Sequence, residues 1–201
     1  LAKPPESLGR LETLSIQLAG ITGQVCSRTD RKELLDFAAD NGVVAEGVSS
    51  APQSVTASQT VNLTRGKTGA AVLCRRFGVK LTVCDVGVAA DIREPTVLNR
   101  QIAYGTGNIA KGPAMTREEC VRAVCTGAEI AADTDADVLG VGEMGIGNTT
   151  TASAVLSVLL GADADAVTGR GGGVTDAAFA KKKAVIRTAI ETNRPDETDT
   201  L

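Results

Sequence analysis

The stretch from Asp137 to Thr151 constrains the fold most strongly, because its character changes twice over a short distance. An apolar run comes first, a glycine-rich segment follows, and apolar residues resume after Asn148-Thr-Thr150. This pattern predicts a buried strand over 137–141, a turn over 142–147 and a helix that runs to Leu160. Backbone N–H groups at the start of such a helix point outward and favour an anion, most often a phosphate.

The glycine turn contains one carboxylate, Glu143. A carboxylate in an apolar, glycine-walled turn tends to have a raised pKa and can act as a base, although an exposed turn residue without a function fits the same spacing. Gly140, Gly142 and Gly145 match the dinucleotide fingerprint only formally, because no acid ends a following strand about 20 residues later. No Lys-Ser/Thr pair follows the last glycine, so the segment is not a P-loop.

Two other short apolar runs also end in polar turns. Residues 34–39 predict a buried strand that ends at Asp40-Asn-Gly42, and residues 80–86 predict a strand that ends beside Asp85. Ligands of open parallel sheets bind at such strand ends, so Asp40 is a candidate site residue. An Asp before Asn-Gly is equally often simple turn chemistry.

Helical patterns separate these strands. The expected helices cover residues 54–77, interrupted by Gly66 and Gly69, then 116–132 with a capping signal at Thr116, and finally 176–192. Weaker strands are expected at 100–103 and 166–168. The alternation predicts an α/β fold of three layers, α/β/α, with a mainly parallel sheet covered by helices on both faces.

Polar side chains on these helices give further candidates. Gln59 and Asn62 share one helix face. They could hydrogen-bond a heterocycle, or they could simply face the solvent. Lys181, Lys182 and Lys183 follow a second glycine turn at 169–173. One of them could face a phosphate, whereas at least two are expected on a solvated helix face, because successive residues point in different directions.

Composition excludes several classes of function. The chain of 201 residues has no histidine, which removes Ser-His-Asp triads and histidine metal sites. Aromatic residues are only 2% and the net charge is −3, which argues against nucleic acid and anionic lipid as partners. No apolar run could span a bilayer. Five cysteines without a CxxC pair predict reduced, mostly buried thiols in a soluble cytoplasmic protein.

Several motifs occur together along the chain. In order they are Lys3-Pro-Pro-x-Ser-Leu-Gly-Arg-Leu-Glu12, Ala39-Asp-x-Gly-Val43, Glu46-Gly-Val48, Val55-Thr56 with Gln59, Gly105-x-Gly-Asn-Ile-Ala110, Gly112-Pro-Ala-Met115 and Gly140-Val-Gly-Glu-Met-Gly-Ile-Gly-Asn-Thr-Thr150. Together they resemble the nicotinate-nucleotide:dimethylbenzimidazole phosphoribosyltransferase family. The motifs span essentially the whole chain.

The resemblance implies a Rossmann-like α/β domain over 24–201, incomplete at its C-terminal end, with residues 1–23 contributing to a small helical domain. It implies a homodimer that needs no metal and no organic cofactor. The implied reaction moves the phosphoribosyl group of nicotinate mononucleotide to 5,6-dimethylbenzimidazole, giving α-ribazole 5′-phosphate and nicotinate in cobalamin assembly.

The resemblance also implies roles for single residues. Gln59 and Met144 fall where the family contacts the base, and Glu143 is the carboxylate near the reacting base. Gly145, in the turn that begins at Gly142, lies close to the phosphate, and Lys182 matches the lysine that faces this group. The implied substrate-binding set is therefore Gln59, Met144, Gly145, Lys182, Asp40 and Gly142.

The chain departs from the family in three respects. Asn41 stands where the family usually has His, and Ala51 replaces a serine that lines the base pocket in some members. The family's main catalytic glutamate, in an Arg-Leu-Gly-Glu-Gly motif, is absent from these residues, so Glu143 has a supporting role and a partial chain is expected. Two alternatives remain, a non-catalytic module that binds the base or nucleotide and an unrelated P-loop-like nucleotide binder.

Overall fold

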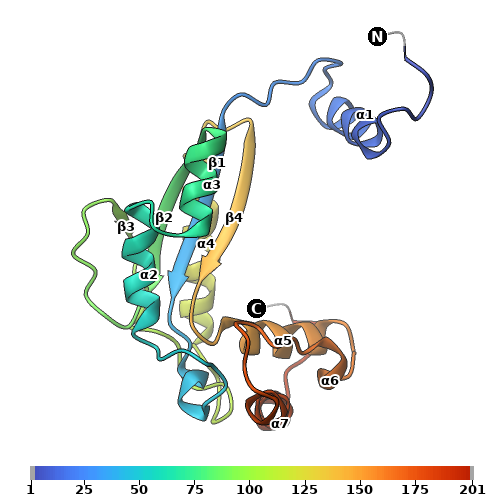
Figure 1. Ribbon diagram of the computed structural model, residues 1–201. Coiled ribbons are helices and arrows are strands. Elements are labelled where there is room, and N and C mark those ends of the chain that lie inside the picture. The colour runs from blue at the N-terminus through green and yellow to red at the C-terminus, as the bar shows by residue number, and fades with distance from the viewer. Residues whose placement is uncertain (1–2, 200–201) are drawn as a thin grey trace.

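The fold is built on a four-stranded, all-parallel sheet in the order β3-β2-β1-β4 (Figure 1). The computed structural model describes residues 3–199. The strands are β1 (Lys32–Ala39), β2 (Val79–Gly87), β3 (Val97–Asn99) and β4 (Val138–Met144). The predicted parallel sheet is confirmed. Because the strands run in one direction, all four carboxyl ends meet at the same edge.

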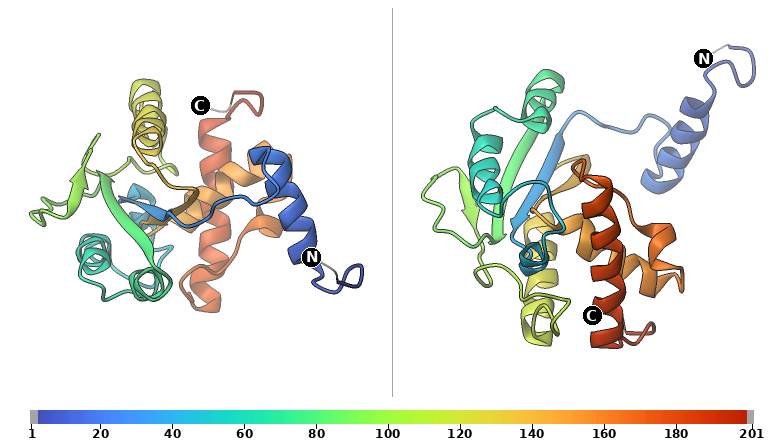
Figure 2. Two further views of the ribbon diagram at one scale, coloured as in Figure 1. Left: turned by 90° about the horizontal axis from the view of Figure 1, so that it is seen from above. Right: turned by 60° about the horizontal axis from the view of Figure 1, so that its bottom comes forward.

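Helices cover both faces of the sheet, as predicted. Helices α2 (Val55–Thr64) and α3 (Gly69–Phe77) lie on one face and α4 (Arg117–Ala132) lies on the other (Figure 2, left). The single helix expected over 54–77 is in fact two. The chain turns at Gly66, with φ +70°, and a new helix starts where the Thr68 side chain accepts a hydrogen bond from the Ala71 N–H.

The core has two layers that follow from strand alternation. Leu35 and Cys84 pack against Ile130 of α4 on one face of the sheet. Val83, next to Cys84 on β2, points to the opposite face and packs against Leu63 of α2. Complete burial of each such side chain contributes about 1.5–3 kcal/mol. The central strands β1 and β2 are therefore covered on both faces, which explains their short, continuous apolar runs. The buried strand expected over 137–141 is wrong in this respect, because β4 lies at the edge of the sheet and its Val141 side chain is 75% exposed.

Three helices form a separate cluster beside the carboxyl end of the sheet. They are α5 (Asn148–Leu159), α6 (Ala164–Val167) and α7 (Asp176–Asn193), and they pack around Ile186. The helices expected up to Leu160 and over 176–192 are confirmed. The strand expected at 166–168 is wrong, because Asp163 caps a short helix there and its side chain accepts a hydrogen bond from the Asp165 N–H.

Two strand boundaries also differ from the prediction. The strand β3 ends at Asn99 instead of covering 100–103, because the Asn99 side chain accepts a hydrogen bond from the Gln101 N–H and folds the chain into a turn. Strand β4 continues to Met144 and includes three residues expected in the glycine turn. After β1 the chain forms a short 3₁₀ helix, η1 (Gly42–Glu46).

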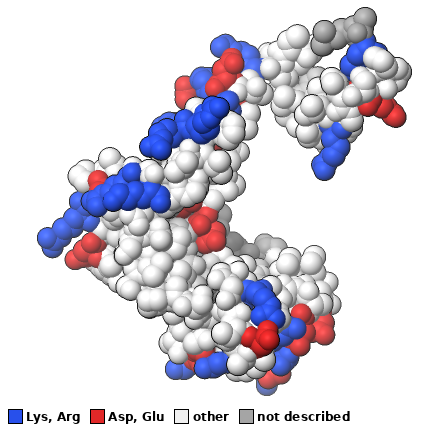
Figure 3. Space-filling model, viewed as in Figure 1, with Lys and Arg blue, Asp and Glu red and all other residues white. Residues whose placement is uncertain are grey.

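The N-terminal helix α1 (Arg10–Thr22) has no buried residue and stands away from the sheet (Figures 1 and 2). Its apolar side chains are exposed, including Leu11, Leu14 and Ile21. In the space-filling view of Figure 3 this segment forms a separate lobe joined to the body by a narrow neck. The division into 1–23 and 24–201 stays a prediction, and residues 1, 2, 200 and 201 of those ranges lie outside the described residues.

The cysteines only partly match the expectation of buried thiols. Cys74 and Cys84 are buried, and burial raises the pKa of the Cys84 thiol to about 11. The expectation is wrong for Cys26 and Cys125, which are exposed. Within residues 3–199, none of the helices combines the length and the apolar character that a membrane span requires.

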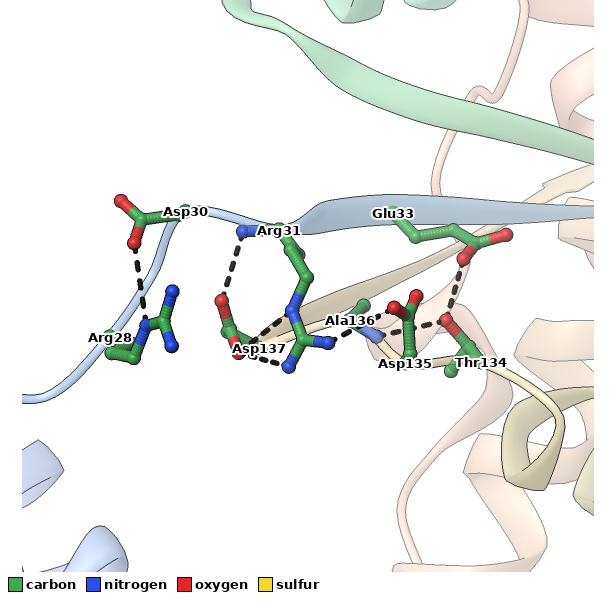
Figure 4. A network of polar contacts seen from close by, with 8 residues as sticks. All are labelled: Arg28, Asp30, Arg31, Glu33, Thr134, Asp135, Ala136 and Asp137. Carbon is green, nitrogen blue, oxygen red and sulfur yellow. Dashed lines mark hydrogen bonds and ion pairs between the residues drawn. The ribbon is translucent and has the colours of Figure 1, made fainter.

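A network of polar contacts joins the amino ends of β1 and β4 (Figure 4). The Arg31 backbone N–H and guanidinium both donate to Asp137, at 3.0 and 2.7 Å. Glu33, which is buried, accepts hydrogen bonds of 2.6 Å from the hydroxyls of Thr82 and Thr134. These contacts set the register in which the two strands meet at their carboxyl ends.

The Asp137→Asn variant tests this anchor through its pH dependence. Hydrogen bonds from Arg31 hold the pKa of Asp137 at about 2, below its ordinary value of 3.8. A lowered folded-state pKa stabilises the protein above pH 3.8, and this contribution disappears as the pH falls towards 2. We expect the variant to melt at a lower temperature at pH 7, with the difference closing below about pH 4. An Asp30→Asn variant serves as the exposed control, and an equal effect of both changes would contradict the anchor.

Candidate active site

The carboxyl ends of β1 and β4 approach so closely that two positions in the turn between β4 and α5, Gly145 and Gly147, have no room for a side chain. A Cβ on Gly145 would lie 2.5 Å from the Ala39 carbonyl oxygen. Gly147 has φ +88°, and a Cβ there would lie 2.7 Å from Cγ2 of Val44. Only glycine satisfies both restrictions. The turn is therefore pressed onto the end of β1.

This turn is shorter than the sequence suggested. Gly142 and Glu143 belong to β4, where they pair with Asp36 and Phe37 of β1. Gly142 is required inside the strand for a packing reason, because a Cβ there would lie 2.9 Å from Oδ2 of Asp36. The predicted turn over 142–147 is corrected to one over 145–147. Glu143 therefore sits on a strand, which holds its position more rigidly than a loop would.

Helix α5 begins directly after the turn and directs its positive end at a polar cavity. Gly147 is its N-cap residue, and no side chain caps the helix. The polar cavity has a volume of about 200 Å³. It is lined by Val48, Ser49, Ser50, Ala51, Gly145, Ile146, Gly147, Asn148, Thr149, Arg170, Gly172 and Val174. An uncapped helix start that opens into a polar cavity is suited to an anion.

Lys182 lies behind this cavity and is only 1% exposed. Its Nζ donates to Oγ1 of Thr149, at 2.8 Å, and to the carbonyl oxygen of Gly169, at 2.9 Å. Within the described part of the chain it makes no ion pair, and burial lowers the pKa of its ammonium group. A buried cation without a counter-ion is costly, and an anion in the neighbouring cavity would relieve that cost. Lys181, by contrast, is exposed.

A second, apolar cavity of about 350 Å³ opens on the α4 face of the sheet. Its wall comes from β1, β2, β4, α4 and the loops over 102–107 and 114–115. Phe37, Val86, Ile102 and Met115 are among its apolar lining residues. Asn148 lines both cavities, which are therefore adjacent. This volume and lining are suited to a small aromatic ring.

Glu143 lines the apolar cavity with a carboxylate that is free to take a proton. The side chain is exposed at the cavity mouth, yet partial desolvation and the nearby charge of Asp36 raise its pKa. The described residues offer it no hydrogen bond and no ion pair. A carboxylate with a raised pKa and an unoccupied lone pair fits the role of a general base.

Sequence reasoning missed Asp36. It lies on β1, is 6% exposed, and its Oδ1 has no hydrogen-bond partner among residues 3–199. Burial raises its pKa, and its charge in turn raises the pKa of Glu143. A single acid within the apolar run 34–39 was the signal that could have identified it.

Asn41 was also missed as a site residue and proves to hold the glycine turn in position. Its Nδ2 donates to the Ile146 carbonyl oxygen, at 3.4 Å, and its Oδ1 accepts from Oγ1 of Thr151, at 3.1 Å. It is 8% exposed and lines the apolar cavity. A neutral side chain with one donor and one acceptor is what these two contacts need.

The other predicted site residues differ in whether they line either cavity. Gly145 lines the polar cavity, and Met144 lines the apolar one while packing with Leu63 of α2. Asp40 is buried, and its Oδ2 accepts a hydrogen bond from the Ala89 N–H, so it braces the loops after β1 and β2. Gln59 lines neither cavity, and Ala51, which the resemblance places at the base pocket, lines the polar cavity and not the apolar one. Gln59 lies near the turn, one helical turn beyond Thr56, whose hydroxyl accepts from the Ile146 N–H.

Comparison with known proteins assigns the chain to one family. Residues 1–201 match a family model described as phosphoribosyltransferase. A nicotinate-nucleotide–dimethylbenzimidazole phosphoribosyltransferase from Ruminiclostridium cellulolyticum is 49% identical, with 100% of this chain and 58% of the relative covered. The same enzyme from Alkaliphilus metalliredigens is 48% identical, with 99% and 58% covered. The chain thus spans about 58% of the length of these relatives.

A solved structure agrees with the sequence comparison. The crystal structure of CobT from Thermus thermophilus superimposes with a TM-score of 0.93 and is 39% identical in sequence. The match covers 99% of this chain and 60% of the other. The α/β fold and its helical layers are therefore those of this family.

The Gly147→Ala variant tests the tight approach of the turn. The substitution forces a left-handed backbone on a residue with a Cβ and a clash with Val44, so we expect unfolding to become easier by about 1–3 kcal/mol. Gly169→Ala is the matched control, because that glycine has open space and an ordinary φ. Chemical denaturation measures both variants. Equal stability of the two would contradict the close packing of the turn.

Proposed function

This chain belongs to the family of nicotinate-nucleotide–dimethylbenzimidazole phosphoribosyltransferases, and on that premise we propose that it carries the transferase site of a cobalamin-assembly enzyme. The reaction moves the phosphoribosyl group of nicotinate mononucleotide to 5,6-dimethylbenzimidazole and gives α-ribazole 5′-phosphate and nicotinate. The observation that carries the proposal is the pair of adjacent cavities joined at Asn148, one suited to a phosphate and one to an aromatic ring.

In this proposal the substrate phosphate occupies the polar cavity. The uncapped start of α5 faces it, and Gly145 and Gly147 allow the phosphate to approach the backbone closely. Lys182 supplies a positive charge from behind Thr149. Arg170, whose guanidinium is held by the Val174 carbonyl oxygen and by Asp176, contributes a second cation at the wall.

The acceptor ring lies with one nitrogen towards Glu143. Neutral benzimidazole keeps a proton on one ring nitrogen while the other attacks the anomeric carbon of the ribose. A new N–C bond forms, the bond from that carbon to the pyridinium nitrogen breaks, and its electron pair neutralises the nicotinate ring. Glu143 accepts the proton that the acceptor ring loses, in the supporting role that the family resemblance implies. The protein otherwise acts by holding the two reactants in line.

Binding without turnover is the alternative, and the length of the chain motivates it. The chain spans about 58% of its relatives, so residues that complete catalysis in the family could be missing from it. Incubating the protein with both substrates and separating the products by chromatography tests turnover. Calorimetry with nicotinate mononucleotide tests binding. Binding with no α-ribazole 5′-phosphate would favour the alternative. The absence of both binding and product would contradict the transferase proposal and the alternative together.

The homodimer that the resemblance implies is part of the proposal, and sedimentation velocity tests it.

Replacing Lys182 with methionine tests the phosphate site. Methionine keeps a similar volume but removes the only fully buried cation near the polar cavity within residues 3–199. We expect affinity for nicotinate mononucleotide to fall at least tenfold, or about 1.4 kcal/mol, as measured by calorimetry. Lys181→Met is the control, because Lys181 is exposed on the same helix. Equal losses in the two variants would remove Lys182 from the site, and melting curves would show whether each variant is folded.

The Glu143→Gln variant tests the proposed base through a pH profile. The raised pKa means that Glu143 gains its proton-accepting form at a higher pH than an ordinary glutamate. We expect kcat/KM to rise with pH through that pKa and then level off, and we expect the variant to lose this acidic limb and about 10²–10⁴-fold in kcat. An unchanged profile would show that Glu143 takes no part in proton transfer. In a chain that binds without turnover, the same profile is measured on the affinity for benzimidazole.

A further inference from the structure

The glycine-rich turn over 169–175 places a cation at the border of the polar cavity. Arg170 lines that cavity together with Gly172 and Val174 of the same turn. Its guanidinium is nevertheless bound by a residue outside the cavity lining, because Nη2 contacts Oδ1 of Asp176 at 2.5 Å. Nη1 donates to the Val174 carbonyl oxygen at 3.2 Å. A cation beside an anion site is therefore neutralised by a carboxylate of its own chain.

The contacts that hold this guanidinium are weak enough to be exchanged. The Asp176 side chain is 92% exposed, so water and salt screen its ion pair with Arg170. The guanidinium also lies 4.8 Å from the centre of the Phe179 ring, which Lys183 contacts at the same distance. A phosphate monoester carries a charge of about −1.5 to −2 at pH 7 and has three acceptor oxygens. It therefore binds a guanidinium more strongly than one exposed carboxylate does.

The turn has the backbone freedom that such an exchange requires. Residues 171–173 are consecutive glycines, and the first and the last have φ +61° and +89°. On one side the turn is tied down, because Lys182 Nζ donates to the carbonyl oxygen that precedes Arg170, at 2.9 Å. On the other side the Ser50 hydroxyl donates to the Gly172 carbonyl oxygen at 3.4 Å, which is a long and weak hydrogen bond. The arginine thus follows a fixed point and precedes a flexible one.

We propose that Arg170 exchanges Asp176 for the substrate phosphate. Arg170 is then a phosphate-binding residue, and Asp176 is a positioning residue that holds the guanidinium at the cavity border while the site is free. The inference rests on the proposed function, which assigns the polar cavity to the phosphate. Lys182 supplies a fixed positive charge from the interior, and Arg170 supplies a second one only when the ligand is present. The glycine turn is consequently more ordered with phosphate bound than without it.

Calorimetry with inorganic phosphate and with ribose 5-phosphate tests the exchange on the 201-residue chain. We expect Asp176→Asn to tighten binding about two- to fivefold, because the competing carboxylate is removed. Arg170→Gln should weaken binding about tenfold. In the Arg170→Gln background, Asp176→Asn should have no further effect, because Asp176 acts only through Arg170.

Lys183→Gln is the matched control. Lys183 is the other cation beside Phe179, and it does not line the polar cavity. Its replacement removes one positive charge from the same helix, so we expect phosphate binding within about twofold of the unaltered chain. Melting curves show whether each variant is folded.

Trypsin digestion measures the order of the turn directly and needs no variant. The enzyme cleaves after exposed arginines, and the bond that follows Arg170 lies in an exposed glycine turn. We expect saturating ribose 5-phosphate to slow this cleavage about fivefold or more. Cleavage after Arg28, in the exposed segment before β1, is the internal reference and should not change. Mass spectrometry identifies the fragments.

Three outcomes would overturn the inference. An equal gain from Asp176→Asn with and without Arg170 would mean that Asp176 acts by its charge alone. Unchanged cleavage after Arg170 with ligand bound would mean that the turn does not respond. Loss of affinity in Lys182→Met but not in Arg170→Gln would leave the phosphate site standing without the exchange. Failure of both phosphates to bind the unaltered chain would refute the site assignment and the inference together, whereas the transferase proposal is judged by product formation.

Discussion

The structure depends on one close approach, that of the turn over 145–147 to the carboxyl end of β1. The parallel pairing of β1 and β4 brings the two segments together, and glycine at both ends of the turn removes the side chains that would hold them apart. The Asn41 side chain then forms one hydrogen bond with the turn, at Ile146, and one with α5, at Thr151. Because the start of α5 is fixed in this way, the orientation of its N–H groups, and with it the polar cavity, follows from strand register.

The same approach separates two unlike environments over a short distance. On one side of Asn148 lie an uncapped helix start, Arg170 and the buried Lys182, all of which favour a negative charge. On the other side lies an apolar cavity whose charged groups are carboxylates. The site therefore offers a ligand two adjacent environments with opposite charge preferences. Charge distribution thus complements cavity shape in setting what the site binds.

Much of the fold was predictable from the sequence because local signals and tertiary packing agree. The strands over 34–39 and 80–86 and the helices that start near Thr116 and Asp176 were all expected. Predictions failed where a long-range contact decides the local structure. Gly142 suggested a turn, yet it pairs with Asp36 inside the sheet, and the Asp36 carboxylate leaves no room for a Cβ at that position. Asn41 looked like a turn residue, and only the folded chain brings it to a cavity wall.

The buried pair formed by Asp36 and Gly142 links the core to the chemistry. An acid on an otherwise apolar face with an unpartnered oxygen costs stability. Its ionised form raises the pKa of Glu143, one position further along β4, so the charge states of the two groups are coupled. A proton that arrives at Glu143 makes ionisation of Asp36 easier, and a proton on Asp36 lowers the pKa of Glu143. Desolvation and the charge of Asp36 thus both raise the pKa of Glu143, and Asp36 does so from a position that lines neither cavity.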